Sequence, residues 1–176
     1  MLTLALAALA GAAVPLAPSL TGAQSKTTAK KTTASKTTAK PAAKAAAAAQ
    51  EKLPDGKQVY ATTCAACHQA TGEGVAGVFP PLAGSEWVTG DEAKLARIIL
   101  HGVTGPIEVA GETFNGMMPP WGPTLKDPDI AAVLTYVRSA WGNKAAPVTA
   151  AKVAAIRAAT SSRTTPWTAA ELAAVK

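Results

Sequence analysis

The sequence predicts an all-α fold made of a few short helices. Apolar residues recur at intervals of three and four in the segments near 54–67, 91–100 and 127–141, and this spacing is typical of helices with one buried face. No segment of useful length alternates apolar and polar residues, so no strand is expected. Alanine accounts for 42 of the 176 residues and aromatic residues for only 5%. Helices so poor in large side chains need help to form a core, and a large buried cofactor would supply it.

Residues 1–23 and 24–50 precede the predicted helices and differ sharply in composition. The first segment is almost entirely apolar and ends in small residues, which is typical of a cleaved secretory signal. No basic residue precedes the apolar run, and the run is close to the about 20 residues that span a bilayer, so an uncleaved membrane anchor is the alternative. Residues 24–50 repeat Lys-Thr-Thr-Ala three times before a run of alanines. This segment has nothing large to bury and is expected to be a disordered tether.

The whole formal charge of +6 lies on this tether, which contains six lysines and no acidic residue. From residue 51 onward, 11 basic and 11 acidic residues balance. A nucleic-acid-binding domain would carry its positive charge on its folded surface, so the distribution argues against nucleic acid as a partner. Contact between the basic tether and an acidic membrane surface stays open.

The first two predicted helices have local start and stop signals. Pro54 suits the first turn of the first helix, and one face of that helix is expected to carry Gly56, Tyr60, Thr63, Cys64 and Cys67. The second helix is expected from about Asp91 to Leu100. Gly102 would stop it, since glycine favours the end of a helix.

The third helix has the clearest pattern of the three. Asp127 is its expected cap and Pro128 occupies its first turn. Its buried face is expected to consist of Ile130, Val133, Leu134, Val137 and Trp141. Gly142 and Asn143 would end it.

Residues 64–68 carry the strongest chemical signal, Cys64-Ala65-Ala66-Cys67-His68. This C-x-x-C-H spacing is that of covalent haem c attachment. Two cysteines on one helical turn can each form a thioether with a vinyl group of the same porphyrin, and the adjacent imidazole can bind the iron. A dithiol redox pair would come with a βαβ pattern, a zinc site would need a second pair of ligands, and so tight a disulfide would stabilise little.

The second axial ligand must come from further along the chain, where Met117, Met118 and His101 are the candidates. Residues 112–123 contain two glycines and three prolines, which exclude a regular helix and predict a structured loop across the open haem face. Met118 precedes Pro119 and is therefore biased toward an extended backbone, which favours it as the ligand. Met117 would then pack or point outward. His101 suits the last turn of a helix, where a cation complements the dipole.

Residues 144–176 extend beyond the third helix. Thr149 could cap a helix that carries Val153 and Ile156, and Thr168 to Glu171 form a capping-box pattern after Pro166-Trp167. We expect this extension to be helical and to pack on the domain. A frayed tail is the alternative, because the segment is rich in alanine.

Four motifs in this order resemble those of class I monohaem c-type cytochromes from bacteria. They are the C-x-x-C-H motif, Phe-Pro-Pro-Leu-Ala-Gly at 79–84, Asn-Gly-Met-Met-Pro at 115–119 and the helix that bears Tyr136. The resemblance covers about residues 53–143, and we assign 51–143 to the domain. It implies one haem c bound covalently through Cys64 and Cys67, with His68 and Met118 as the axial ligands.

The resemblance also implies how this site is supported. The carbonyl of Pro80 would accept a hydrogen bond from the ring of His68, and Leu82 would pack on the haem. Gly56, which has no side chain, would let the first helix cross the last one close to Tyr136.

The function implied is electron transfer, not catalysis. An iron whose axial positions are both filled by the protein has no open site for a substrate. The resemblance is to periplasmic carriers and to the cytochrome subunits of periplasmic dehydrogenases and terminal oxidases, so redox proteins are the expected partners and the location is periplasmic or exported. A peroxidase-type enzyme or a gas sensor with a displaceable Met118 is the alternative, but a peroxidase would need a second C-x-x-C-H motif and the sequence has one.

Overall fold

The structure is a computed structural model, and it describes residues 52–175. The predictions for residues 1–23 and 24–50 lie outside the described residues. The elements, in chain order, are α2 (Gly56–Thr63), α3 (Ala65–His68), α4 (Glu86–Thr89), α5 (Glu92–His101), β1 (Val103–Val109), β2 (Glu112–Met118), α6 (Asp127–Val137), α7 (Ala150–Ala159) and α8 (Ala169–Ala174). The predicted all-α class is confirmed, with one two-stranded sheet added to it. Within this part of the chain, no helix is long and apolar enough to cross a membrane.

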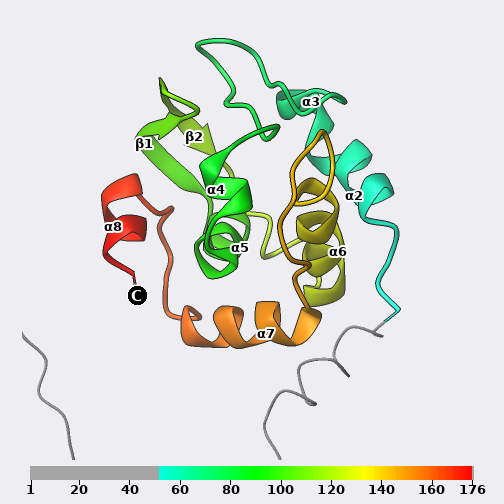
Figure 1. The fold of residues 1–176 in the computed structure, drawn as a ribbon. Coiled ribbons are helices and arrows are strands. Elements are labelled where there is room, and N and C mark those ends of the chain that lie inside the picture. Colours follow the sequence, from blue (N-terminus) through cyan, green and yellow to red (C-terminus); the bar gives the residue numbers. More distant parts are fainter. Residues whose placement is uncertain (1–51, 176) are drawn as a thin grey trace, which may run out of the picture. The chain divides into compact units, whose positions relative to one another are not determined.

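Helices α2 and α6 cross closely and form one side of the structure (Figure 1). Asp55 begins α2, because its carboxylate accepts hydrogen bonds from the backbone N–H groups of the next residues. Gly56 lies against the backbone of Ala132 in α6, so the expected crossing at a glycine is present. Tyr60 is 2% exposed and its ring packs on that of Tyr136, with 5.5 Å between the ring centroids.

Helix α6 differs from the prediction at both ends. The cap is Lys126 and not Asp127; the carboxylate of Asp129 accepts from the Lys126 N–H at 3.2 Å. The helix ends at Val137, so Trp141 lies beyond it, in a turn with a φ of 52°. The early end has a physical cause, since the side-chain amide of Asn143 donates to the Val137 carbonyl at 2.7 Å and replaces the next helical bond.

The first part of the segment 112–123, which was expected to be an irregular loop, forms β2 of an antiparallel hairpin, so the prediction of no strand was wrong. β1 pairs with β2 from Val103 opposite Met118 to Val109 opposite Glu112. The two connecting residues, Ala110 and Gly111, both have positive φ values, as a tight hairpin turn requires. Two glycines and one proline in these strands disguised the pattern, although the buried positions Val103, Ile107 and Val109 show partial alternation.

The C-terminal residues supply two further helices. Helix α7 is capped by Thr149, whose hydroxyl accepts from the Lys152 N–H at 3.2 Å, and it contacts α5 and α6. Val153 and Ile156 are buried beneath it. Helix α8 contacts β1 and buries Leu172 completely. Figure 1 shows α7 crossing near the ends of α5 and α6, and α8 beside the hairpin.

Candidate haem site

An apolar cavity of about 350 Å³ lies among α3, α5, α6 and the hairpin. Its walls include Leu95, Ile98 and Ile99 from α5, Val133, Leu134 and Val137 from α6, and Val103, Ile107 and Phe114 from the hairpin. The segment 77–82 covers another side. Such a chamber suits a large flat apolar ligand, because most of the groups that it offers are hydrocarbon and only a few are polar.

Both cysteines of the C-x-x-C-H motif line this cavity. Cys64 is buried and Cys67 is exposed, and both thiols are free in the described part of the chain. The turn is fixed by the His68 N–H, which donates to the Cys64 carbonyl at 2.9 Å. Burial raises the pKa of the Cys64 thiol, and the neighbouring Cys67 adds to this effect. Two thiols on one turn therefore face the same apolar space, as attachment at two points requires.

The imidazole of His68 also lines the cavity and is 8% exposed. Its Nδ1 lies 2.9 Å from the carbonyl oxygen of Pro80. Because a carbonyl can only accept, Nδ1 carries the proton and Nε2 is the nitrogen with a lone pair for a metal. Burial lowers the pKa of His68 in spite of the bond to Pro80, so the ring is held in the neutral form that a ligand needs.

The loop that carries Pro80 is held by backbone contacts around two glycines. The Gly74 N–H donates to the His68 carbonyl at 3.0 Å, and the Leu82 N–H donates to the Gly72 carbonyl at 2.7 Å. A Cβ at Gly74, whose φ is 67°, would collide with the carbonyls of Phe79 and Pro80. Leu82 lines the cavity. The loop thus holds both Pro80 and Leu82 beside the imidazole.

Met117 and Met118 line the cavity from the end of β2, whereas His101 is not among its lining residues. The side chain of Met118 is partly buried and packs against both groups of core residues, while Met117 is 68% exposed. Successive strand residues point to opposite faces, which separates the two methionines. The Nε2 atom of His101 lies 2.7 Å from the hydroxyl of Thr160. The structure therefore brings both methionines to the cavity that His68 lines, with Met118 the more buried of the two, and leaves His101 elsewhere.

Two buried polar residues near the cavity were not predicted from the sequence to be site residues. Asn143 was expected only to end a helix, but its amide donates to the Leu82 carbonyl at 3.0 Å and its oxygen accepts from the Gly84 N–H at 2.8 Å. It ties the Pro80–Leu82 loop to the end of α6. A polar amide directly after Gly142, the glycine that was expected to end the helix, was the only local signal for this role.

Arg138, the second missed residue, is 4% exposed. Its guanidinium donates to the carbonyls of Val88 at 2.7 Å, Gly90 at 3.0 Å and Ala146 at 2.7 Å. Val88 and the preceding residue Val137 both line the cavity, so a buried cation lies behind its wall. None of the ion pairs among the described residues includes it. Nothing in the local sequence marks this arginine, because its partners are up to fifty residues away.

These residues fit haem c. The cavity presents two thiols for thioether bonds, an oriented neutral imidazole and two methionine side chains, all in one apolar chamber. Within residues 52–175, no group of three or more His, Cys, Asp or Glu side chains is placed to hold a metal ion alone. The donor set therefore suits a porphyrin-bound iron.

Comparison with known proteins indicates the same cofactor. The family model described as Cytochrome c matches residues 53–141. Cytochrome c-552 of Thermus thermophilus is 45% identical over 93 residues, which are 51% of this chain and 70% of that protein. The cytochrome c subunit of alcohol dehydrogenase (quinone) from Komagataeibacter europaeus is 41% identical over 99 residues, which are 54% of this chain and 21% of that subunit.

A third relative belongs to an oxidase. The CcoP subunit of the cbb3-type cytochrome c oxidase from Azospirillum is 35% identical over 100 residues, which are 53% of this chain and 30% of that subunit. The chain thus spans most of a cytochrome c-552 but a third or less of these two subunits. With half of its length matched by the family model and a C-x-x-C-H motif facing an apolar cavity, the chain belongs to the cytochrome c family of electron-transfer proteins that bind haem c covalently, and Cys64 and Cys67 fit the attachment motif.

Proposed function

We propose that this protein transfers electrons in the periplasm, with its haem iron bound axially by His68 and Met118, and that it serves a dehydrogenase or a terminal oxidase. The observation that carries the proposal is the shared cavity, which an oriented imidazole and a partly buried methionine enter from separate elements. The location is supported by the relatives, which include subunits of a quinone-linked dehydrogenase and of an oxidase, and by the apolar N-terminal run typical of export.

Bound haem supplies a one-electron change between ferric and ferrous iron. The protein would hold the iron through Nε2 of His68 and Sδ of Met118, and this would leave no position for a substrate. A methionine ligand favours the ferrous state relative to a second imidazole. The apolar walls favour the same state, because they solvate the extra positive charge of ferric iron poorly. The His68–Pro80 bond keeps the imidazole in one orientation through the cycle.

Electron exchange needs a surface where a partner can approach the cavity. Val78 and Met117 line the cavity and are 56% and 68% exposed. The charges of residues 51–176 balance, so long-range attraction is weak and a small, transient interface is expected. The rate of electron exchange should accordingly depend little on ionic strength.

The ligation is tested with the ferric spectrum of the haem-loaded protein. We expect a low-spin spectrum with the weak far-red band of methionine–iron charge transfer. Met118→Ala should abolish this band, and the matched variant Met117→Ala should leave it. A high-spin spectrum of the unmodified protein would overturn the proposal in favour of a sensor or a peroxidase-type enzyme. Loss of the band in Met117→Ala alone would show that the ligand is Met117.

The role as a carrier is tested by fractionating the native host and measuring electron exchange. The haem-containing chain should be recovered from the periplasm or from the outer face of the inner membrane. It should be reduced by dehydrogenase-containing membranes, or oxidised by oxidase-containing membranes, at rates that change less than twofold between low and physiological salt. Recovery in the cytoplasm, or failure to exchange electrons with both kinds of membrane, would contradict the role.

A further inference from the structure

We propose that residues 163–175, here called the C-terminal brace, position the Met118 side chain at the haem iron by holding the β1–β2 hairpin from behind. The brace lies outside residues 53–141, the part that matches the family model. The inference depends on the proposed ligation by Met118. It assigns to the brace a function in the redox site, beyond that of closing the fold.

The brace is joined to β1 at the residue that pairs with Met118. Val103 lies opposite Met118 in the hairpin, and on its other side it forms a parallel bridge with Trp167. Two backbone hydrogen bonds make this bridge: the Thr104 N–H donates to the Trp167 carbonyl at 2.8 Å, and the Trp167 N–H donates to the Gly102 carbonyl at 2.9 Å. Val103 is therefore held between the brace and the strand end that carries Met118.

Gly102 strengthens this link because the chain passes very close to Met118 there. A Cβ at Gly102 would collide with the carbonyl oxygen of Met118 and would lie 3.1 Å from the nitrogen of Pro120. The φ of Gly102 is 78°, a conformation that favours glycine. Gly102 therefore accepts the hydrogen bond from Trp167 and also lies in close contact with the backbone of Met118.

The side chains of the brace complete the core behind the hairpin. Leu172 is fully buried and belongs to one apolar cluster together with Ile98, Val103, Ile107, Val109 and Phe114. Met118 and Trp167 pack against the same cluster. The five partners of Leu172 all line the haem cavity, whereas Leu172 does not. Leu172 can therefore affect the iron only through the residues that it supports, which makes it a positioning residue.

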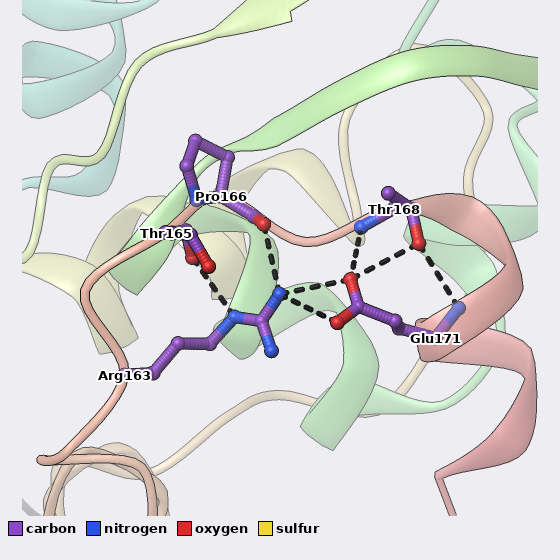
Figure 2. Close-up of polar contacts among 5 residues, drawn as sticks. All are labelled: Arg163, Thr165, Pro166, Thr168 and Glu171. Atoms are coloured by element: carbon purple, nitrogen blue, oxygen red, sulfur yellow. Dashed lines mark hydrogen bonds and ion pairs between the residues drawn. The ribbon is translucent and has the colours of Figure 1, made fainter.

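A polar network holds the brace in its shape (Figure 2). Arg163 bonds both carboxylate oxygens of Glu171, at 2.8 and 3.0 Å, and donates to the carbonyls of Thr165 and Pro166. The same carboxylate accepts from the N–H of Thr168 at 2.8 Å, and the Thr168 hydroxyl accepts from the Glu171 N–H. This is a complete capping box at the start of α8.

The network also fixes the indole ring of Trp167, the residue that forms the bridge to β1. The guanidinium of Arg163 lies 3.6 Å from the centroid of the Trp167 ring, a distance at which a cation attracts the ring face. An isolated exposed ion pair contributes little. Here Arg163 and Glu171 enclose residues 165–168, so their geometry sets the position of Trp167 and, through it, of β1.

If the brace holds Met118, loosening it should weaken the bond between iron and methionine more than it disturbs the rest of the fold. We expect a competing ligand to reveal this. Imidazole added to the ferric protein displaces Met118, and its affinity rises when Met118 is held less firmly. Coupling between a supporting element and a site is typically 5–150-fold, and we expect about a tenfold rise in imidazole affinity for Leu172→Ala.

The matched control is Val153→Ala on α7. Val153, like Leu172, is fully buried and does not line the cavity, but it packs in the other core cluster, between α7 and α5–α6. Both variants lose stability to a new cavity. Only Leu172→Ala should raise the imidazole affinity and lower the reduction potential and the intensity of the far-red band. Glu171→Gln, at an exposed position, should shift the same readouts in the same direction by a smaller factor, and it decides the question if Leu172→Ala does not fold.

Met118→Ala separates the two proposals. If it leaves the far-red band and the imidazole affinity unchanged, the ligation proposed above is wrong and the role of the brace fails with it. If it removes the band while Leu172→Ala binds imidazole no better than Val153→Ala, the ligation stands and only the brace proposal is overturned. Unchanged imidazole affinity in Glu171→Gln, where Leu172→Ala cannot be obtained, likewise overturns it.

Discussion

The contact between Gly56 and α6 makes Gly56→Ala the most direct test of the packing in this fold. An alanine Cβ at this position would collide with the Ala132 carbonyl oxygen and would lie 2.7 Å from the Ala132 carbonyl carbon and 3.0 Å from the Cβ of Tyr136. The main obstacle is helix backbone, which cannot rotate away as a flexible side chain could. Helices α2 and α6 would have to separate, and the packing of Tyr60 on Tyr136 would loosen with them.

The expected cost follows from two opposing effects. Overpacking of a close-packed core costs about 1–3 kcal/mol, and a clash with backbone favours the upper part of this range. Alanine is preferred over glycine within a helix by about 1 kcal/mol, which offsets part of the cost. The net loss in the free energy of unfolding should be about 2 kcal/mol. With a denaturant slope of about 4 kcal/mol per molar guanidinium chloride, the midpoint should fall by about 0.5 M.

Equilibrium unfolding of the haem-loaded protein measures this change. Lys57→Ala on the same helix is the control, because Lys57 is exposed and surface substitutions usually stay within about 0.5 kcal/mol. A midpoint for Gly56→Ala that equals or exceeds that of Lys57→Ala would refute the reasoning. It would show that α2 can move away from α6 without loss.

Three further predictions concern polar groups that are buried or partly buried. Tyr60→Phe should lower the free energy of unfolding by about 1 kcal/mol, because it removes the hydroxyl that donates to the Gln69 carbonyl at 2.5 Å; an unchanged denaturation midpoint would contradict this. Burial, and after it three neighbouring arginines, lower the pKa of His101 in the folded protein. As the pH falls, the imidazole is therefore protonated first in the unfolded chain. The free energy of unfolding should accordingly fall as the pH drops below about 6.5, the pKa of a histidine in an unfolded chain. His101→Gln should flatten that part of the pH profile, and an equally steep profile would count against it. Arg138→Met should lower the free energy of unfolding by about 3 kcal/mol. A redox titration of this variant should also show a lower reduction potential, because the substitution removes a buried cation near the cavity that favours ferrous iron. Arg157→Met, at a half-exposed arginine paired with a carboxylate, should leave the potential unchanged, and equal shifts in both variants would refute the effect of burial.

Features encoded by neighbouring residues were predictable from the sequence. The start of α5 at Asp91 and its end at Gly102, the cap of α7 at Thr149 and the capping box at Thr168 all appear in the structure at the expected residues. Each depends on contacts within one helical turn, so the local sequence contains both partners. The end of α6 was misplaced for the opposite reason, because Asn143 folds back on Val137 from outside the helical pattern.

The hairpin shows why pattern alone failed between residues 103 and 118. Strand partners lie up to fifteen positions apart, and Gly105 and Pro106 interrupt the alternation of β1. The strand gains its stability from Met118 on one edge, from Trp167 on the other and from Leu172 beneath. No window of sequence around β1 contains those partners.

By itself, the sequence determined the chemistry of attachment: Cys64, Cys67 and His68 lie within one turn of chain, and a helical turn is set by local hydrogen bonds. It also determined that the charge of +6 is carried by residues 24–50. Only the tertiary structure decided how deeply each methionine is buried at the cavity that both share with His68, where α6 ends, and that the C-terminal residues lie behind the hairpin. Those features depend on burial between segments distant in the chain, and burial is a property of the packed molecule, not of any one segment.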